Sequence, residues 1–181
     1  MARRNIGVAI EVPQPYGGHL QRWRLRLGDP EGNRVPPHVT LLPPTAIPAE
    51  RLPLIEEHLR RIAAGETAFT ITLRGTGTFR PVSPVTFVQL ATGISECERL
   101  EARVRSGPLF RELKFNYHPH VTVAQDVDDA ALERGFTELA TYAATFDVSG
   151  FTLFEEGADR VWRPQRDFPF GPDEGGVPPE A

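Results

Sequence analysis

The tripeptide His-Val-Thr occurs twice in this chain, and this repeat constrains the fold more than any other feature. The two copies are residues 38–40 and 120–122, which begin 82 positions apart, and a proline precedes each. In a β-strand, residues i and i+2 point to the same face, so each copy places an imidazole beside a hydroxyl and sends its valine into the core. A pocket that uses both copies needs the two strands to be neighbours. We therefore expect two similar half-lobes, related by an approximate two-fold axis, that share one cleft.

The remaining elements follow from apolar spacing and turn residues. Strands are predicted at 5–12, 38–42 (closed by Pro43 and Pro44), 69–73, 85–90 and 120–124, as one long strand at 146–154, and as a hairpin partner at 160–162. Helices are predicted at 15–27, at 48–64, from Ser95 to about 105 with a Ser95–Glu98 capping box, and from Asp128 or Asp129 through Leu139.

Strands and helices therefore mix without regular βαβ alternation, which favours an α+β fold with antiparallel sheets, a central cleft and outer helices. The chain has 181 residues, 40% of them apolar, so it can bury a core of one domain. We expect residues 1–170 to form that single bilobal domain. Residues 171–181 have no large apolar side chain except Val177, so they are predicted to form a disordered tail.

Composition excludes several classes of protein. No apolar run approaches the roughly 20 residues of a membrane span, and the first residues do not resemble a signal peptide. Cys97 is the only cysteine, which excludes an internal disulfide and a cysteine-cluster metal site, so the expected compartment is the cytoplasm. The net charge is −4, far from the basic surface of a duplex-binding protein. A short anionic ligand remains compatible with the more basic first two thirds.

The two His–Thr pairs suit phosphodiester chemistry. Imidazole, with an unperturbed pKa of about 6.5, can give or take a proton near neutrality. Two opposed histidines supply a base for the attacking oxygen and an acid for the leaving oxygen. Two hydroxyls can donate to the non-bridging oxygens, where negative charge must be held. This chemistry requires no metal and no cofactor.

With these motifs the chain resembles the two-histidine (2H) phosphoesterase superfamily, in its LigT-like branch of 2′-5′ RNA ligases and cyclic phosphodiesterases. The resemblance covers roughly residues 5–170 and includes the segments 75–90 and 151–170. It implies that His38 and His120 form the acid–base pair, without saying which is the base, and that Thr40 and Thr122 bind the phosphate. It also implies metal-independent opening of a 2′,3′-cyclic phosphate, usually to a 2′-phosphate.

Two features depart from the family pattern. Many relatives carry an arginine three residues after the second threonine, where this chain has Gln125, so a cation that binds the substrate could be missing. Pro43 and Pro44 replace an aromatic turn, which could reshape the rim of the pocket.

Several further residues are candidates for the substrate site. Phe79, Tyr117 and Trp162 could stack a base, as aromatic residues do in single-stranded RNA recognition, although each taken alone is more typical of a core or rim residue. Arg80 could contact an anion. His118 has a metal-ligand spacing to His120, but no nearby carboxylate completes such a site, so no metal is expected. His118 is interpreted as a residue of the pocket rim or one that lies behind the residues touching the substrate.

The expected protein is a monomeric enzyme without an obligate protein partner, acting on RNA termini or small nucleotides that carry a cyclic phosphate. A 2′-5′ ligase activity would be the reverse use of the same site. The alternatives are a cyclic phosphodiesterase for another small ligand, such as ADP-ribose cyclic phosphate, and an RNA- or nucleotide-binding module without turnover. The second is disfavoured because binding alone does not need a proton-transfer pair.

Overall fold

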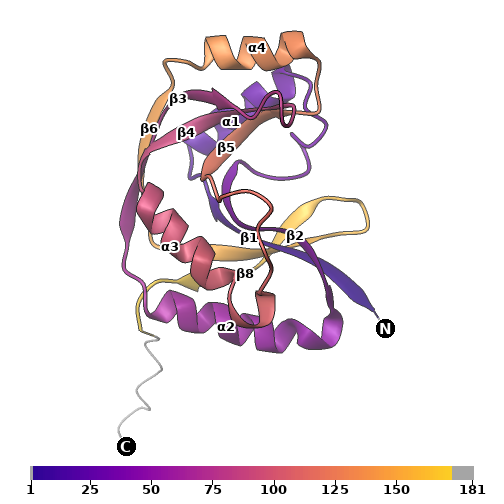
Figure 1. The fold of residues 1–181 in the computed structure, drawn as a ribbon, viewed down its shortest axis with the longest axis vertical. Coiled ribbons are helices and arrows are strands. Elements are labelled where there is room, and N and C mark those ends of the chain that lie inside the picture. Colours follow the sequence, from indigo (N-terminus) through magenta and orange to yellow (C-terminus); the bar gives the residue numbers. More distant parts are fainter. Residues whose placement is uncertain (1, 173–181) are drawn as a thin grey trace, which may run out of the picture.

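The computed structural model describes residues 2–172, so most of the predicted C-terminal tail lies outside the described residues. Figure 1 shows the arrangement of the elements. In chain order they are β1 (Arg3–Glu11), α1 (Tyr16–Arg26), β2 (His38–Pro48), η1 (Ala49–Arg51), α2 (Leu52–Ala64), β3 (Phe69–Thr78), β4 (Val85–Thr92), α3 (Ile94–Val104), η2 (Gly107–Leu109), β5 (His120–Gln125), α4 (Asp129–Glu138), β6 (Ala143–Val148), β7 (Gly150–Glu156) and β8 (Trp162–Pro169).

The strands form one curled antiparallel sheet in the order β6-β3-β4-β5-β2-β1-β7-β8. Its centre is the seam between β5 and β2, where Val39 pairs with Val121. Outward from the seam, one half reads β5-β4-β3-β6 and the other reads β2-β1-β7-β8, and we name these halves the β5 lobe and the β2 lobe. The two lobes thus have the same strand count and the same antiparallel pattern, which confirms the predicted α+β fold with approximate two-fold symmetry.

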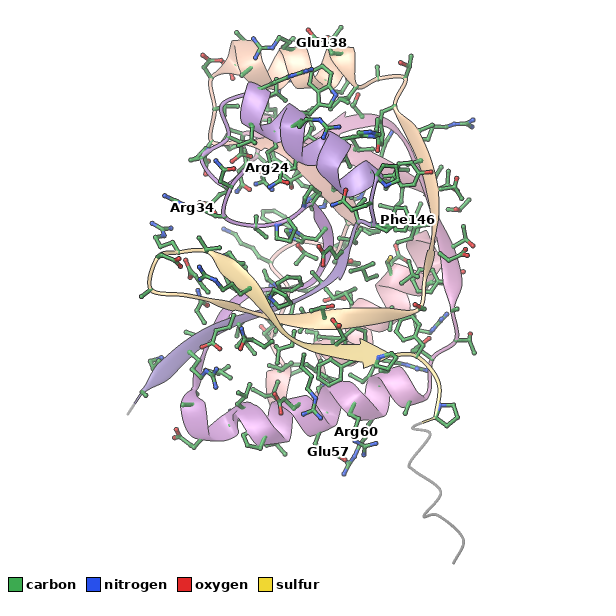
Figure 2. All side chains as sticks on the ribbon, turned by 180° about the vertical axis from the view of Figure 1, so that it is seen from behind. Arg24, Arg34, Glu57, Arg60, Glu138 and Phe146 are labelled. Carbon is green, nitrogen blue, oxygen red and sulfur yellow. The ribbon has the colours of Figure 1, made fainter. Side chains whose placement is uncertain are left out.

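Each lobe is covered by two helices. α1 and α4 pack on the β5 lobe, while α3 packs against β2 and α2 packs against α3 and β8 (Figure 1). In α2 the buried positions Ile55, Leu59 and Ala63 recur at helical spacing, and in α3 Cys97, Leu100 and Val104 do the same. The outer faces are charged, as with Glu57 and Arg60 on α2 and Glu138 on α4 (Figure 2). Among residues 2–172 no helix is both long and apolar enough to span a membrane.

The predicted long strand at 146–154 is wrong. The chain leaves the sheet at Ser149, so β6 pairs with β3 at the edge of the β5 lobe and β7 pairs with β1 in the β2 lobe. Gly150 permits this transfer, because a Cβ there would lie 2.6 Å from the carbonyl oxygen of Phe168. The lobes are therefore interleaved, and the C-terminal hairpin completes the lobe that the N-terminal strands begin.

Three smaller expectations also need correction. β2 continues through Pro43 and Pro44 to Pro48, because both prolines fall in the register irregularity between the pairs Val8–Leu42 and Ile6–Thr45, where no ladder donor is needed. Gly93, and not Ser95, is the N-cap of α3, and the Ser95 hydroxyl bonds to Glu96 instead. The hairpin partner predicted at 160–162 is the longer β8, which begins at Trp162.

Candidate active site

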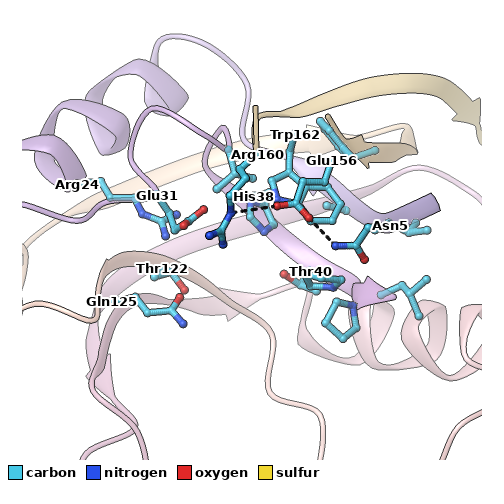
Figure 3. Close-up of a pocket in the computed structure, with 18 of the residues that line it drawn as sticks. Asn5, Arg24, Glu31, His38, Thr40, Thr122, Gln125, Glu156, Arg160 and Trp162 are labelled. Atoms are coloured by element: carbon cyan, nitrogen blue, oxygen red, sulfur yellow. Dashed lines mark hydrogen bonds and ion pairs between the residues drawn. The ribbon is translucent and has the colours of Figure 1, made fainter. Parts of the chain in front are cut away.

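The seam between β2 and β5 brings the two His–Thr pairs onto one surface. Because Val39 lies opposite Val121 in an antiparallel pair, His38 falls beside Thr122 and Thr40 beside His120. The two valines are fully buried beneath them. All four polar side chains line one cavity of about 480 Å³ at the junction of the lobes. Figure 3 shows this cavity with His38, Thr40 and Thr122 labelled. The structure thus brings together the four side chains that the sequence analysis selected, and their catalytic role stays a prediction.

Both histidine rings are held in the same way. His38 Nδ1 lies 2.7 Å from the carbonyl oxygen of Pro36, and His120 Nδ1 lies 2.7 Å from that of His118. A carbonyl can only accept, so Nδ1 carries the hydrogen in each ring and donates it. Nε2 is then the free acceptor of the neutral ring, and no described residue hydrogen-bonds to it in either histidine. Each imidazole thus offers one nitrogen to the cavity.

Burial lowers the pKa of both histidines. For His38 the pKa falls from 6.5 to about 4, first because burial penalises the charged ring and then because the charges of Arg24 and His120 oppose protonation, against the raising effect of the bond to Pro36. For His120 the pKa is lowered by burial and by His118, again against its backbone hydrogen bond. His38 is therefore neutral at pH 7 in the free protein.

Two aromatic side chains pack against the ring of His120. The ring of Phe79 meets it edge-on with centroids 4.9 Å apart, and Phe87 lies 5.1 Å away. Phe79 and Phe87 also pack together at 4.6 Å, and both contact the exposed His118. Phe79 and His118 are not among the residues that line the cavity. The structure places both of them around the His120 ring and outside the lining of the cavity.

The other predicted substrate residues divide into two groups. Gln125 and Trp162 line the cavity. Tyr117 lies beneath it, where its hydroxyl donates to the Thr40 carbonyl oxygen at 2.7 Å and burial raises its pKa. Arg80 lies elsewhere, bonded to Thr78 and paired with Glu133 at 3.0 Å. The structure thus brings two of these four residues to the cavity.

Six polar residues of the cavity wall were missed by sequence reasoning. They come from β1, α1, the loop after α1, the β5–α4 turn, β7 and the β7–β8 turn: Asn5, Arg24, Glu31, Asp126, Glu156 and Arg160. Glu156 accepts a hydrogen bond of 2.6 Å from Asn5 and pairs with Arg160 at 3.6 Å (Figure 3). Only Arg24 had a usable signal, since it occupies a core-facing position of α1 together with Gly17 and Leu20.

A backbone hydrogen bond joins two of the segments that line one end of the cavity. The backbone N–H of Trp162, at the start of β8, donates to the carbonyl oxygen of Arg34 at 2.7 Å. This bond connects the β7–β8 hairpin to the loop between α1 and β2, and both segments contribute to the wall. Among residues 2–172, no three histidine, cysteine, aspartate or glutamate side chains gather closely enough to hold a metal ion.

The arrangement has the parts needed for acid–base chemistry on a small anion. Two imidazole nitrogens and two hydroxyls converge on a cavity whose volume suits a nucleotide-sized ligand. A histidine can exchange a proton with either end of a reacting group, and the hydroxyls can donate to oxygens that gain charge.

Comparison with known proteins gives consistent matches. A model of the 2′-5′ RNA ligase superfamily matches residues 12–160. Proteins named "Putative phosphoesterase" in Halalkalibacterium halodurans and Bacillus cytotoxicus are 31% and 30% identical, over 68% and 79% of this chain and 71% and 84% of their own lengths.

Solved structures match over most of the chain. E. coli LigT complexed with phosphate superposes with a TM-score of 0.69 and 22% identity, covering 94% of this chain and 99% of LigT. The complex with 3′-AMP gives a TM-score of 0.68 and 20% identity, covering 93% and 99%. At this identity the structural match concerns the fold.

Proposed function

The chain belongs to the 2′-5′ RNA ligase superfamily, whose fold is LigT-like, and from this premise we propose that it hydrolyses 2′,3′-cyclic phosphates of RNA ends or small nucleotides without a metal. One histidine takes a proton from water as the water oxygen attacks phosphorus. The other gives a proton to the ribose oxygen whose bond to phosphorus breaks, leaving a 2′-phosphate and a free 3′-hydroxyl. Thr40 and Thr122 donate to the non-bridging oxygens.

The observation that carries this proposal is the identical setting of the two histidines. Each Nδ1–H is bonded to the backbone carbonyl two residues earlier, so each ring presents Nε2 to the same cavity from opposite lobes. A protein that only binds its ligand needs neither the same tautomer in both histidines nor two Nε2 atoms that face one cavity. In the free protein burial lowers both pKa values. A bound phosphate anion favours uptake of one proton by the pair, which then has one acid and one base.

The other interpretations use the same cavity. Ligation is the reverse reaction, in which a 5′-hydroxyl replaces water. A cyclic phosphodiesterase for ADP-ribose cyclic phosphate would need room for a diphosphate and a second ribose beside the cyclic phosphate. A nucleotide-binding module would hold the ligand without turnover. We further propose that residues 1–170 act as one bilobal domain, as a monomer in the cytoplasm, since the chain's own strands supply all four His and Thr groups.

The test is turnover of a panel of 2′,3′-cyclic nucleotides and of RNAs with cyclic ends in the presence of EDTA. The position of the phosphate in the product is assigned by ³¹P NMR. We expect hydrolysis to a 2′-phosphate at a rate unaffected by the chelator. Loss of activity in EDTA that Zn²⁺ or Mn²⁺ restores would contradict the metal-independent mechanism. Tight binding of the panel without turnover would favour the binding module.

A further inference from the structure

Arg24 is a charged residue on the face of α1 that otherwise packs against the core. The buried residues of this helix are Gly17, Leu20 and Arg24, and Arg24 is only 3% exposed. Charged side chains are rarely buried without a partner, because removing an ion from water is costly. Its guanidinium reaches the cavity wall, on the side of the pocket where Glu31, Thr122 and Gln125 lie in Figure 3.

The partner of Arg24 is Asp29, which is also 3% exposed. Asp29 Oδ2 accepts from Arg24 Nε at 2.7 Å and from the backbone N–H of Gln125 at 3.0 Å. Asp29 Oδ1 accepts from the backbone N–H of Glu31 at 2.8 Å. Three hydrogen-bond donors thus satisfy this carboxylate. Through them Asp29 connects α1 to the end of β5 at Gln125, three residues after Thr122.

The guanidinium is much less fully satisfied than the carboxylate. Only Nε donates to Asp29, and Nη1 and Nη2 of Arg24 donate to no group within residues 2–172. An arginine has five N–H donors in a planar fork that matches the oxygens of a phosphate. The N–H groups on Nη1 and Nη2 of this buried side chain are therefore available to an acceptor in the cavity.

The other charges of the wall are already engaged or lie at the rim. Glu31 pairs with Arg34 at 3.1 Å, and Glu156 is bonded to Asn5 and paired with Arg160. Asp126 is exposed. Among the described residues that line the cavity, Arg24 is the buried cation, and its charge acts on His38, which lies beside Thr122.

From this geometry we propose that Arg24 binds the reacting phosphate, donating from Nη1 and Nη2 to a non-bridging oxygen on the His38–Thr122 side of the cavity. The inference rests on the proposed function and names the anion-binding group of that site. Asp29 acts as the positioning residue that holds the fork and aligns it with β5. Negative charge on these oxygens increases as water adds to phosphorus, so Arg24 stabilises the transition state more than the bound substrate.

The experiment compares Arg24→Gln and Arg24→Lys with Arg22→Gln, a control at an exposed position of the same helix. Two measurements are made: steady-state kinetics, which give kcat and KM for a 2′,3′-cyclic nucleotide, and isothermal titration calorimetry, which gives the Kd of inorganic phosphate. For Arg24→Gln we expect kcat to fall by about 10²–10³ with a smaller change in KM, and phosphate affinity to fall by about 10- to 100-fold. Arg22→Gln should match the wild type in both.

Arg24→Lys keeps the result interpretable if the glutamine variant fails to fold. A lysine preserves the charge beside Asp29, but a single ammonium cannot replace the fork that serves Asp29 and phosphate together. Phosphate affinity should therefore fall by about tenfold in a variant with an unchanged circular dichroism spectrum. Wild-type phosphate affinity in either folded variant would overturn the inference. If wild-type protein fails to hydrolyse the nucleotide, the proposed function fails, while the phosphate titration still decides the role of Arg24.

Discussion

The lowered pKa of His38 predicts that acidification destabilises the fold through this one side chain. The unfolded chain takes up a proton at His38 near pH 6.5, whereas the folded chain does so only near pH 4. Between these values the unfolded state binds more protons, so lowering the pH through this window favours unfolding. The free energy lost between pH 7 and pH 4 is at most about 3 kcal/mol, since one pKa unit corresponds to about 1.4 kcal/mol.

The assay is urea unfolding followed by far-UV circular dichroism at intervals from pH 7 to pH 4. His38→Gln removes the titrating group. Between pH 7 and pH 4 the variant should therefore lose about 3 kcal/mol less unfolding free energy than the wild type loses. The carboxylates titrate in both proteins and cancel in the comparison. His19→Gln, a change at an exposed position of α1, is the matched control and should reproduce the wild-type pH dependence.

Direct titration by NMR provides the independent check. The His38 ring resonances should change near pH 4, with the Nδ1-protonated tautomer populated above that pH because Nδ1 donates to Pro36. A midpoint near 6.5, together with equal pH dependence of His38→Gln and wild type, would refute the reasoning that burial holds this ring neutral.

Three further predictions concern catalysis. The profile of kcat/KM against pH should be bell-shaped, with both limits belonging to the coupled pair His38 and His120; a flat profile between pH 5 and 8 would argue against a proton-transfer pair. Thr40→Val and Thr122→Val keep the strand shape and remove a donor, so each should lower kcat by about 10–10³ while leaving the bell in place, and a fully active double variant would exclude this role. Phe79→Leu removes the edge contact behind His120 and should lower kcat by about 2- to 10-fold, corresponding to about 0.5–1.5 kcal/mol; Phe69→Leu, at the stacked pair with Phe170, serves as the control, and an equal kcat in both would refute the positioning role.

The sequence was sufficient where local periodicity decides the structure. The period-2 rule predicted that His38 and Thr40 share a face, and the 3,4 spacing of Leu52, Ile55, Leu59 and Ile62 predicted α2. α4 begins at one of the two aspartates proposed for its start, since Asp128 accepts from the Ala131 N–H at 2.7 Å. In each case the deciding interactions lie within a few residues of one another.

Long-range pairing was not predictable in the same way. Residues 146–154 alternate like one strand, and nothing within them indicates that β6 pairs with β3 while β7 pairs with β1. Arg24 was missed for a related reason. Its partner Asp29 lies in a turn-forming segment, and the burial of both depends on α1 packing against β5, which the chain reaches almost one hundred residues later.

The central claim is that His38 and His120 act as one acid–base pair, and the most direct measurement is kcat for His38→Ala, His120→Ala and their double variant. Each single variant should lower kcat by about 10²–10⁴. The double variant should lose far less than the product of the two effects, because one broken proton transfer already stops the reaction. His19→Ala controls for loss of an exposed histidine. Turnover at the wild-type rate by either single variant, or strictly multiplicative losses in the double variant, would contradict the account.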